Sequence, residues 1–113
     1  MATDSEFIAA ADALLSRIGA ALDAALEDSD ADVDWSLNDG ILEIDCAARG
    51  KLIVNRHVHN REIWVAARSG GFHFRPQDGG FVDTRSGAAL DATLTRLLRE
   101  QAGLDVDFSK LGG

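Results

Sequence analysis

Five carboxylates fall within the eight residues from Glu27 to Asp34, in the segment LEDSDADVDW. Like charges this close repel one another, and a protein core could not hold them, so we expect them at the surface. Carboxylate oxygens are the ligands that hard cations prefer. Counted from Asp28, Val33 stands at the glycine position of an EF-hand loop and Asp39 at its final glutamate, a poor match. The segment therefore indicates either an open cation site completed by water or a solvated charge run without a ligand.

A second group with possible chemistry surrounds two histidines. His57 and His59 form an H-x-H pair, and on an extended chain their side chains point the same way. Two imidazoles could bind a transition metal, but most such sites need three or four ligands. Glu62 or His73 could supply another ligand, although nothing in the spacing fixes this. The sequence has no Gly-rich phosphate loop, CxxC pair or nucleophile-elbow motif.

The element that positions the first carboxylates is an N-terminal helix. Thr3 and Glu6 fit a capping box, and apolar residues then recur every three or four positions, which predicts a helix from about Asp4 to Glu27. Asp23 lies on its polar side, close in projection to Glu27. Together with the acids that follow, these side chains could form one ridge along the edge between the helix and the first strand. We call this set the acidic ridge: Asp23, Glu27, Asp28, Asp30, Asp32 and Asp34.

Turn signals separate six short alternating runs after this helix, as in an antiparallel meander. The runs are 32–37, 41–47, 51–57, 62–68, 72–76 and 81–85. A leucine stripe then predicts a second helix, with Ser86 as a plausible N-cap and Gly103 at its end. The order αββββββα predicts an α+β fold, a two-layer α/β sandwich with both helices on one face of an antiparallel sheet. The expected shared core contains Leu14, Ile18, Leu22, Leu94, Leu97 and Leu98.

Strand alternation sorts the two tryptophans. Trp35 has the parity of Val33 and Leu37, which predicts a packed aromatic, whereas Trp64 shares the parity of charged neighbours. An exposed tryptophan on an open sheet face is a candidate partner contact, although packing against long neighbouring side chains is an alternative. Pairing of the neighbouring strands would place Asn55, His57 and Trp64 in one exposed patch. We call these three residues the Trp64 patch.

Composition limits the class of protein. The 113 residues show no break in composition, so residues 1–113 are predicted to form a single domain, and 46% hydrophobic residues are enough for a core. The formal charge of 11 − 19 = −8 argues against nucleic acid as a partner and favours cations or basic proteins. The long apolar stretch is amphipathic and interrupted by acids, so we expect it to be neither a signal peptide nor a membrane span. The sequence therefore predicts a cytoplasmic protein. The single cysteine, Cys46, alternates with core residues and is expected to be a small buried hydrophobe.

Several short motifs occur in an order and spacing that resemble the frataxin family in its bacterial form. The resemblance extends from about Asp4 to Gly103. It rests on DSEF at 4–7, the acidic end of the first helix, Asn55-Arg56, Ile63-Trp64, Gly70-Gly71 with His73-Phe74, and Arg85-Ser86-Gly87. The chain departs from the family at His57, His59 and Glu62, where glutamine, proline and glutamine are common. It also has Gly19 and Ala20 where bacterial relatives often carry a glutamate pair.

The resemblance implies a role in iron–sulfur cluster assembly. It implies weak binding of iron by the acidic ridge, contacts with cysteine desulfurase and the iron–sulfur scaffold protein, and Trp64 as a scaffold contact. It also implies that the protein is a regulator and not an enzyme, and that it is a monomer without iron. Whether it speeds or slows cluster assembly is left open. Two alternatives from other classes are an acidic decoy that blocks a basic partner surface and a ferroxidase.

Overall fold

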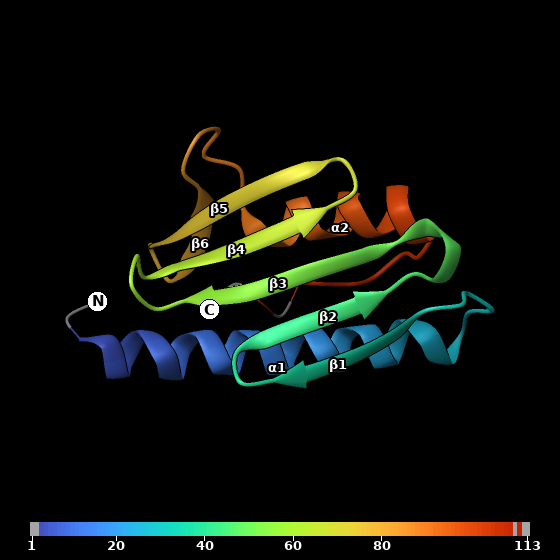
Figure 1. Cartoon of the computed structure of the whole chain (residues 1–113), viewed down its shortest axis with the longest axis horizontal. Helices are drawn as coiled ribbons and strands as arrows, with labels where there is room; N and C mark the ends of the chain where they lie inside the picture. Colours follow the sequence, from blue (N-terminus) through green and yellow to red (C-terminus); the bar gives the residue numbers. More distant parts are fainter. Residues whose placement is uncertain (1–2, 110, 112–113) are drawn as a thin grey trace.

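The structure of the protein is a computed structural model that describes residues 3–109 and 111 (Figure 1). The first helix is α1 (Asp4–Glu27) and the second is α2 (Leu90–Ala102). Six strands and one short 3-10 helix lie between them: β1 (Asp34–Asn38), β2 (Ile41–Asp45), η1 (Ala47–Arg49), β3 (Lys51–His57), β4 (Glu62–Ala67), β5 (Gly70–Gln77) and β6 (Gly80–Asp83). The predicted order of helices and strands is confirmed.

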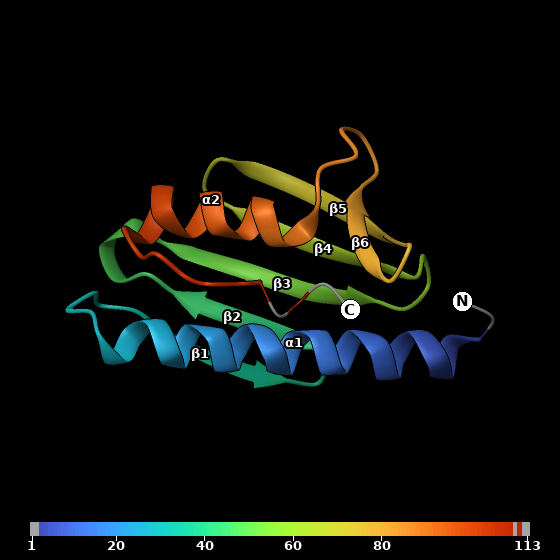
Figure 2. The same cartoon turned by 180° about the vertical axis from the view of Figure 1, so that it is seen from behind.

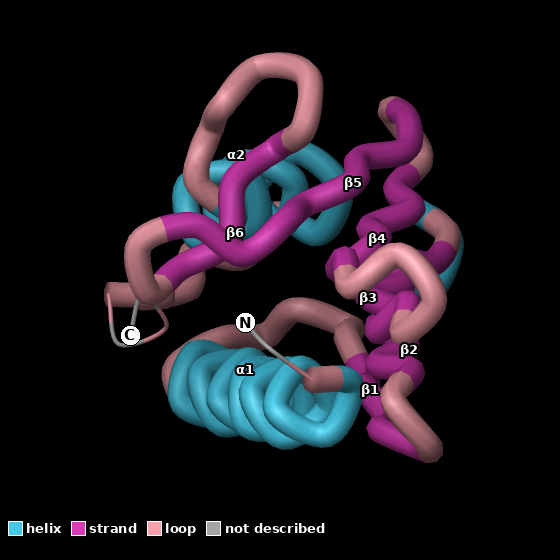
Figure 3. The backbone as a smooth tube through the Cα atoms, turned by 90° about the vertical axis from the view of Figure 1, so that its left-hand side faces the viewer, coloured by secondary structure: helices cyan, strands magenta, loops and turns pink. Residues whose placement is uncertain are grey.

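The strands form one antiparallel sheet in which each strand pairs only with its neighbours in sequence, from β1 to β6. Both helices lie on the same side of this sheet, as the views from behind and from the end show (Figures 2 and 3). The predicted two-layer α+β sandwich is therefore confirmed. The outer face of the sheet carries the side chains of opposite parity and is not covered by either helix.

The ends of the helices have different chemistry. Thr3 Oγ1 accepts a hydrogen bond from the Glu6 backbone N–H at 3.1 Å, so the predicted cap of α1 is confirmed. Gly103 ends α2 in the left-handed conformation, with φ 64°, as expected. Ser86 as the N-cap of α2 is wrong: the N-cap is Ala89, and the Ser86 hydroxyl accepts from the Ala88 N–H within the preceding loop.

The core lies between the helices and the inner face of the sheet. All six residues predicted for it, three on each helix, are buried: Leu14, Ile18, Leu22, Leu94, Leu97 and Leu98. The segment after α2 packs on the domain through buried Leu104, Val106 and Phe108. Cys46 is buried, as predicted, and burial raises the pKa of its thiol, with a further contribution from the Asp45 charge. No helix in the described part of the chain is long and apolar enough to cross a lipid bilayer.

Candidate functional site

The structure places the acidic ridge where α1 ends and β1 begins. Asp23 and Glu27 lie on the last turns of α1, and Asp28 is its C-cap. The next two ridge residues, Asp30 and Asp32, lie in the connecting loop, and the last opens β1. This loop lies at the end of the molecule where α1 and β1 run side by side (Figure 1). All six carboxylates are exposed, as the sequence predicted, and none belongs to an ion pair in the described part of the chain.

One ridge carboxylate is oriented by a tryptophan. The Trp35 indole N–H donates to Asp23 Oδ1 at 2.8 Å, which leaves the other carboxylate oxygen free of this bond. The indole lies against α1 at Gly19, where a Cβ atom would be only 2.6 Å from the Trp35 ring. The predicted packing of Trp35 is confirmed, since the partly buried ring packs on the core. Sequence reasoning missed the bond to Asp23, although glycine in the middle of a helix was a signal of close approach.

A further carboxylate extends the ridge onto the second strand. Asp45 on β2 is directly opposite Asp34 on β1, and both side chains are exposed. The signal for Asp45 was present in the sequence, because a tight turn at 38–41 fixes the pairing of these strands. Next to it, Lys51 Nζ lies 3.1 Å from Glu43 Oε2. The hydrogen bond to Glu43, the Glu43 charge and, more weakly, the Asp45 charge raise the pKa of Lys51.

The geometry is that of an open carboxylate surface and not of a closed cage. Among residues 3–109 and 111, no three His, Cys, Asp or Glu side chains converge closely enough to enclose a metal ion. The alternative site around His57 and His59 is therefore not assembled within these residues. His57 belongs to β3, whereas His59 is exposed in the turn that follows. Iron binding by the ridge stays a prediction, and any such binding would use few protein oxygens for each cation.

The three residues of the Trp64 patch come together on the outer face of the sheet. Asn55 on β3 is directly opposite Trp64 on β4, and the His57 ring stacks on the Trp64 ring with centroids 3.8 Å apart. His73 on β5 stacks on Trp64 as well, at 4.2 Å. The Trp64 indole N–H donates to Glu62 Oε1 at 2.8 Å. The predicted adjacency of the three residues is confirmed, although each is half-buried and not fully exposed, and their role in partner binding stays a prediction. Sequence reasoning did not include His73, because it joins the patch through the β4–β5 register.

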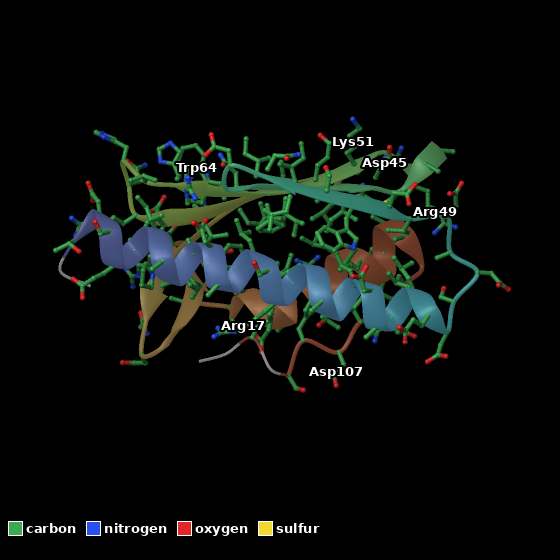
Figure 4. All side chains as sticks on the ribbon, turned by 90° about the horizontal axis from the view of Figure 1, so that it is seen from below. Arg17, Asp45, Arg49, Lys51, Trp64 and Asp107 are labelled. Atoms are coloured by element: carbon green, nitrogen blue, oxygen red, sulfur yellow. The ribbon has the colours of Figure 1, made fainter. Side chains whose placement is uncertain are left out.

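The two candidate surfaces are separate. Figure 4 shows Trp64 toward one end of the outer sheet face, with Asp45 and Lys51 toward the other end. The Trp64 patch lies on β3 and β4, and the ridge lies along α1, the following loop and β1. A small α+β domain with an exposed acidic edge and an uncovered sheet face is the class of protein that this fold and these surfaces define.

Comparison with known proteins assigns the family. Residues 1–104 match the family model described as a frataxin-like domain. An iron–sulfur cluster assembly protein CyaY from Dechloromonas aromatica is 54% identical over 100 residues, which cover 88% of this chain and 92% of that relative. A CyaY from Ralstonia nicotianae is 43% identical over 104 residues and covers 92% of each chain. The chain belongs to the frataxin-like family.

Solved structures agree with this assignment. The frataxin from Psychromonas ingrahamii, of the CyaY protein family, superimposes with a TM-score of 0.84 at 31% identity, over 96% of this chain and 99% of that one. A trimeric frataxin from the yeast Saccharomyces cerevisiae, complexed with ferrous iron, gives a TM-score of 0.73 at 26% identity, over 83% and 86% of the two chains. The resemblance read from the short motifs is thus confirmed.

Proposed function

We propose that this protein acts in iron–sulfur cluster assembly, as an iron-binding regulator and not as an enzyme. It binds iron weakly through the acidic ridge and is a monomer without iron. It contacts cysteine desulfurase and the iron–sulfur scaffold protein in the cytoplasm. The names of its relatives support the process, and the yeast frataxin with ferrous iron supports the metal.

The observation that carries the proposal is that the ridge has no cationic partner among residues 3–109 and 111. Elsewhere in the described part of the chain, carboxylates such as Asp4, Asp12 and Asp105 each pair with an arginine. The six ridge carboxylates form no such pair with any residue that the structure describes. Close carboxylates without counter-ions repel one another, and a cation relieves this repulsion. Iron as a hard cation accepts oxygen ligands, and incomplete coordination by separate side chains makes the affinity modest.

The same surface suits a basic protein. A cluster of like charges produces a local field that steers an oppositely charged partner toward it. The desulfurase contact is therefore proposed at the ridge, where iron and the desulfurase could compete or cooperate. The scaffold contact is proposed at the Trp64 patch, because aromatic side chains on an otherwise open sheet face are frequent hot spots of protein interfaces.

The test is an anaerobic NMR titration of the protein with Fe²⁺. Broadened or shifted amides should cluster at the ridge, and they should be lost from an Asp30→Asn/Asp32→Asn variant. Glu100→Gln is the matched control, since Glu100 is an exposed carboxylate that pairs with Arg96 outside the ridge. Changes confined to His57 and His59 would contradict the ridge site. Rapid iron oxidation with turnover would instead favour a ferroxidase. Binding to a basic partner surface that does not change with iron would favour an acidic decoy.

A further inference from the structure

Both faces of the Trp64 indole are already covered within the protein. His57 and His73 come from the strands on either side of β4, so their rings lie against opposite faces of the indole. The ring planes are nearly parallel, at 10° and 6° to the indole. The indole N–H already donates a hydrogen bond to the Glu62 carboxylate. A partner therefore cannot stack on Trp64 without displacing an imidazole, and the groups left for contact are the ring edges.

The strands hold these rings in place. In the β4–β5 register, Trp64 is directly opposite His73. On β3, the residue directly opposite Trp64 is Asn55, two residues before His57. Side chains fixed by their own packing lose little conformational entropy when a partner binds. The ladder of rings thus presents two imidazoles at a fixed spacing, with Trp64 as the rigid element between them.

The imidazole nitrogens are arranged to bind acceptors. His57 Nδ1 accepts a hydrogen bond from the Asn60 N–H at 3.4 Å, so the proton of the neutral ring belongs on Nε2. The His73 side chain is 50% exposed, and its Nδ1 lies 4.0 Å from Glu62 Oε1, which already accepts from the indole. An imidazole that takes up a proton becomes a donor at both nitrogens and carries a positive charge.

The carboxylate within the stack and the one that shares a hollow with His73 are already hydrogen-bonded. Glu62 accepts from the indole, and Asp83, which lines a hollow of about 150 Å³ beside His73, accepts from the Arg85 backbone N–H. The hollow is also lined by Arg85, which adds a cationic residue on the His73 side of the stack.

Of the carboxylates in the neighbouring turns, Asp39 of the β1–β2 turn is paired, with its Oδ1 3.5 Å from Arg56 Nη2. Arg75 follows His73 by two residues on β5 and therefore shares its face of the sheet. Ile41 on β2 and Asn55 on β3 are uncharged, and in the β3–β4 turn Arg61 pairs with Asp4, which belongs to α1. Protonated imidazoles would thus make this end of the outer face positive, on a chain whose net charge is −8.

We propose that the exposed imidazole edges of His57 and His73 are the recognition groups of this surface and bind a carboxylate-bearing segment of the partner protein. Binding strengthens as the imidazoles take up protons, and Trp64 is the positioning residue that holds them. Ile41, which is 46% exposed on the neighbouring strand, receives an apolar side chain of the same segment. This inference rests on the proposed scaffold contact at the Trp64 patch.

The experiment measures the affinity of the purified scaffold protein of the same organism by calorimetry at two pH values. The wild type should bind about tenfold tighter at about pH 6 than at about pH 8, because imidazole changes its charge in this range. His57→Gln/His73→Gln should bind equally at both, since the amide cannot be protonated. His59→Gln is the matched control, because this exposed histidine lies outside the stack, and it should keep the wild-type pH dependence.

The outcomes separate the two proposals. Equal wild-type affinity at both pH values, or a double variant that keeps the pH dependence, overturns the role of the imidazoles and leaves the Trp64 contact standing. Failure to bind at either pH overturns both. A measurement on the free protein is independent of the partner: in Trp35→Phe, the fluorescence of the remaining Trp64 should be quenched as the stacked imidazoles are protonated. Fluorescence that ignores pH, or that His57→Gln/His73→Gln leaves unchanged, would contradict the stack itself.

Discussion

The acidic ridge and the Trp64 patch are polar surfaces of the same small domain, but they are built in opposite ways. The ridge carries like charges on a helix end, a loop and the first residue of a strand, and none of them pairs with a cation within the described part of the chain. In the patch, each ring contacts another ring or a hydrogen-bond partner, and all of them come from the middle strands of the sheet. An open charged surface can accept a cation with a variable share of water. A preformed surface instead suits a protein contact of fixed geometry.

The largest effect should come from Trp35, which connects the ridge to the core. Trp35→Ala should lower the free energy of unfolding by about 3 kcal/mol, because it removes a large aromatic packed on the core and leaves a cavity. This is at the low end of the usual range because the ring is only partly buried. Urea denaturation measures the loss. If Trp35→Ala lowered the free energy of unfolding no more than Trp64→Ala does, the distinction between a tryptophan packed on the core and one on the outer sheet face would fail.

The second prediction concerns the other tryptophan. Trp64→Ala should weaken scaffold binding at least about thirtyfold, on the order of 2 kcal/mol, while the domain remains folded. The reason is that Trp64 faces away from the helices and supports the two imidazoles. Calorimetry with the scaffold protein and a parallel circular dichroism melt give the two readouts. Wild-type affinity in the variant, or unfolding as severe as that of Trp35→Ala, would contradict it.

The third prediction uses the close approach of Gly19 to Trp35. Gly19→Ala should destabilise the protein by about 1 kcal/mol. The reason is that the steric clash of the new methyl group with the indole costs more free energy than the higher helix propensity of alanine provides. In a Trp35→Leu background the collision is absent, and the same substitution should become stabilising by up to about 1 kcal/mol. Chemical denaturation of the four proteins forms a double-mutant cycle. The same sign in both backgrounds would show that the two side chains are not in contact.

The smallest effect is expected at the ridge. Asp30→Asn/Asp32→Asn should raise the Tm of the iron-free protein by about 2 °C, because it relieves repulsion among exposed charges. It should also reduce the stabilisation that Fe²⁺ provides. Differential scanning calorimetry with and without the metal tests both. Asp105→Asn is the control, since Asp105 pairs with Arg99 and its loss should not raise the Tm. A lower Tm in the ridge variant would mean that these carboxylates are already compensated.

The fold could be predicted almost completely from the sequence. The bounds of α1 followed from the Thr3 cap and an uninterrupted apolar stripe, both of which are local signals. The strands followed from alternation between tight turns. The start of α2 could not be predicted in the same way, because Ser86 satisfies the Ala88 N–H inside a loop before the helix begins. A side chain that fits a cap also fits a turn, and only the path of the chain decides between them.

The candidate surfaces were less completely predictable, because they depend on register between elements. The residues of the ridge all lie within the stretch 23–34 and were found, whereas Asp45 becomes part of that surface only through its pairing with Asp34. His73 likewise joins Trp64 only through the β4–β5 register. The bond between Trp35 and Asp23 joins a strand to a helix. Contacts of this kind require the packing of the helix on the sheet, which no local pattern specifies.

The strictly sequential order of the sheet has a consequence for how the chain folds. Because every strand pairs with the next one along the chain, each hairpin closes a short loop and can form while the rest of the protein is still being synthesised. Only the seating of the two helices and the final segment joins the distant ends of the chain. We therefore expect a meander that assembles early and rapidly and a slower last step in which the C-terminal residues Leu104, Val106 and Phe108 complete the core.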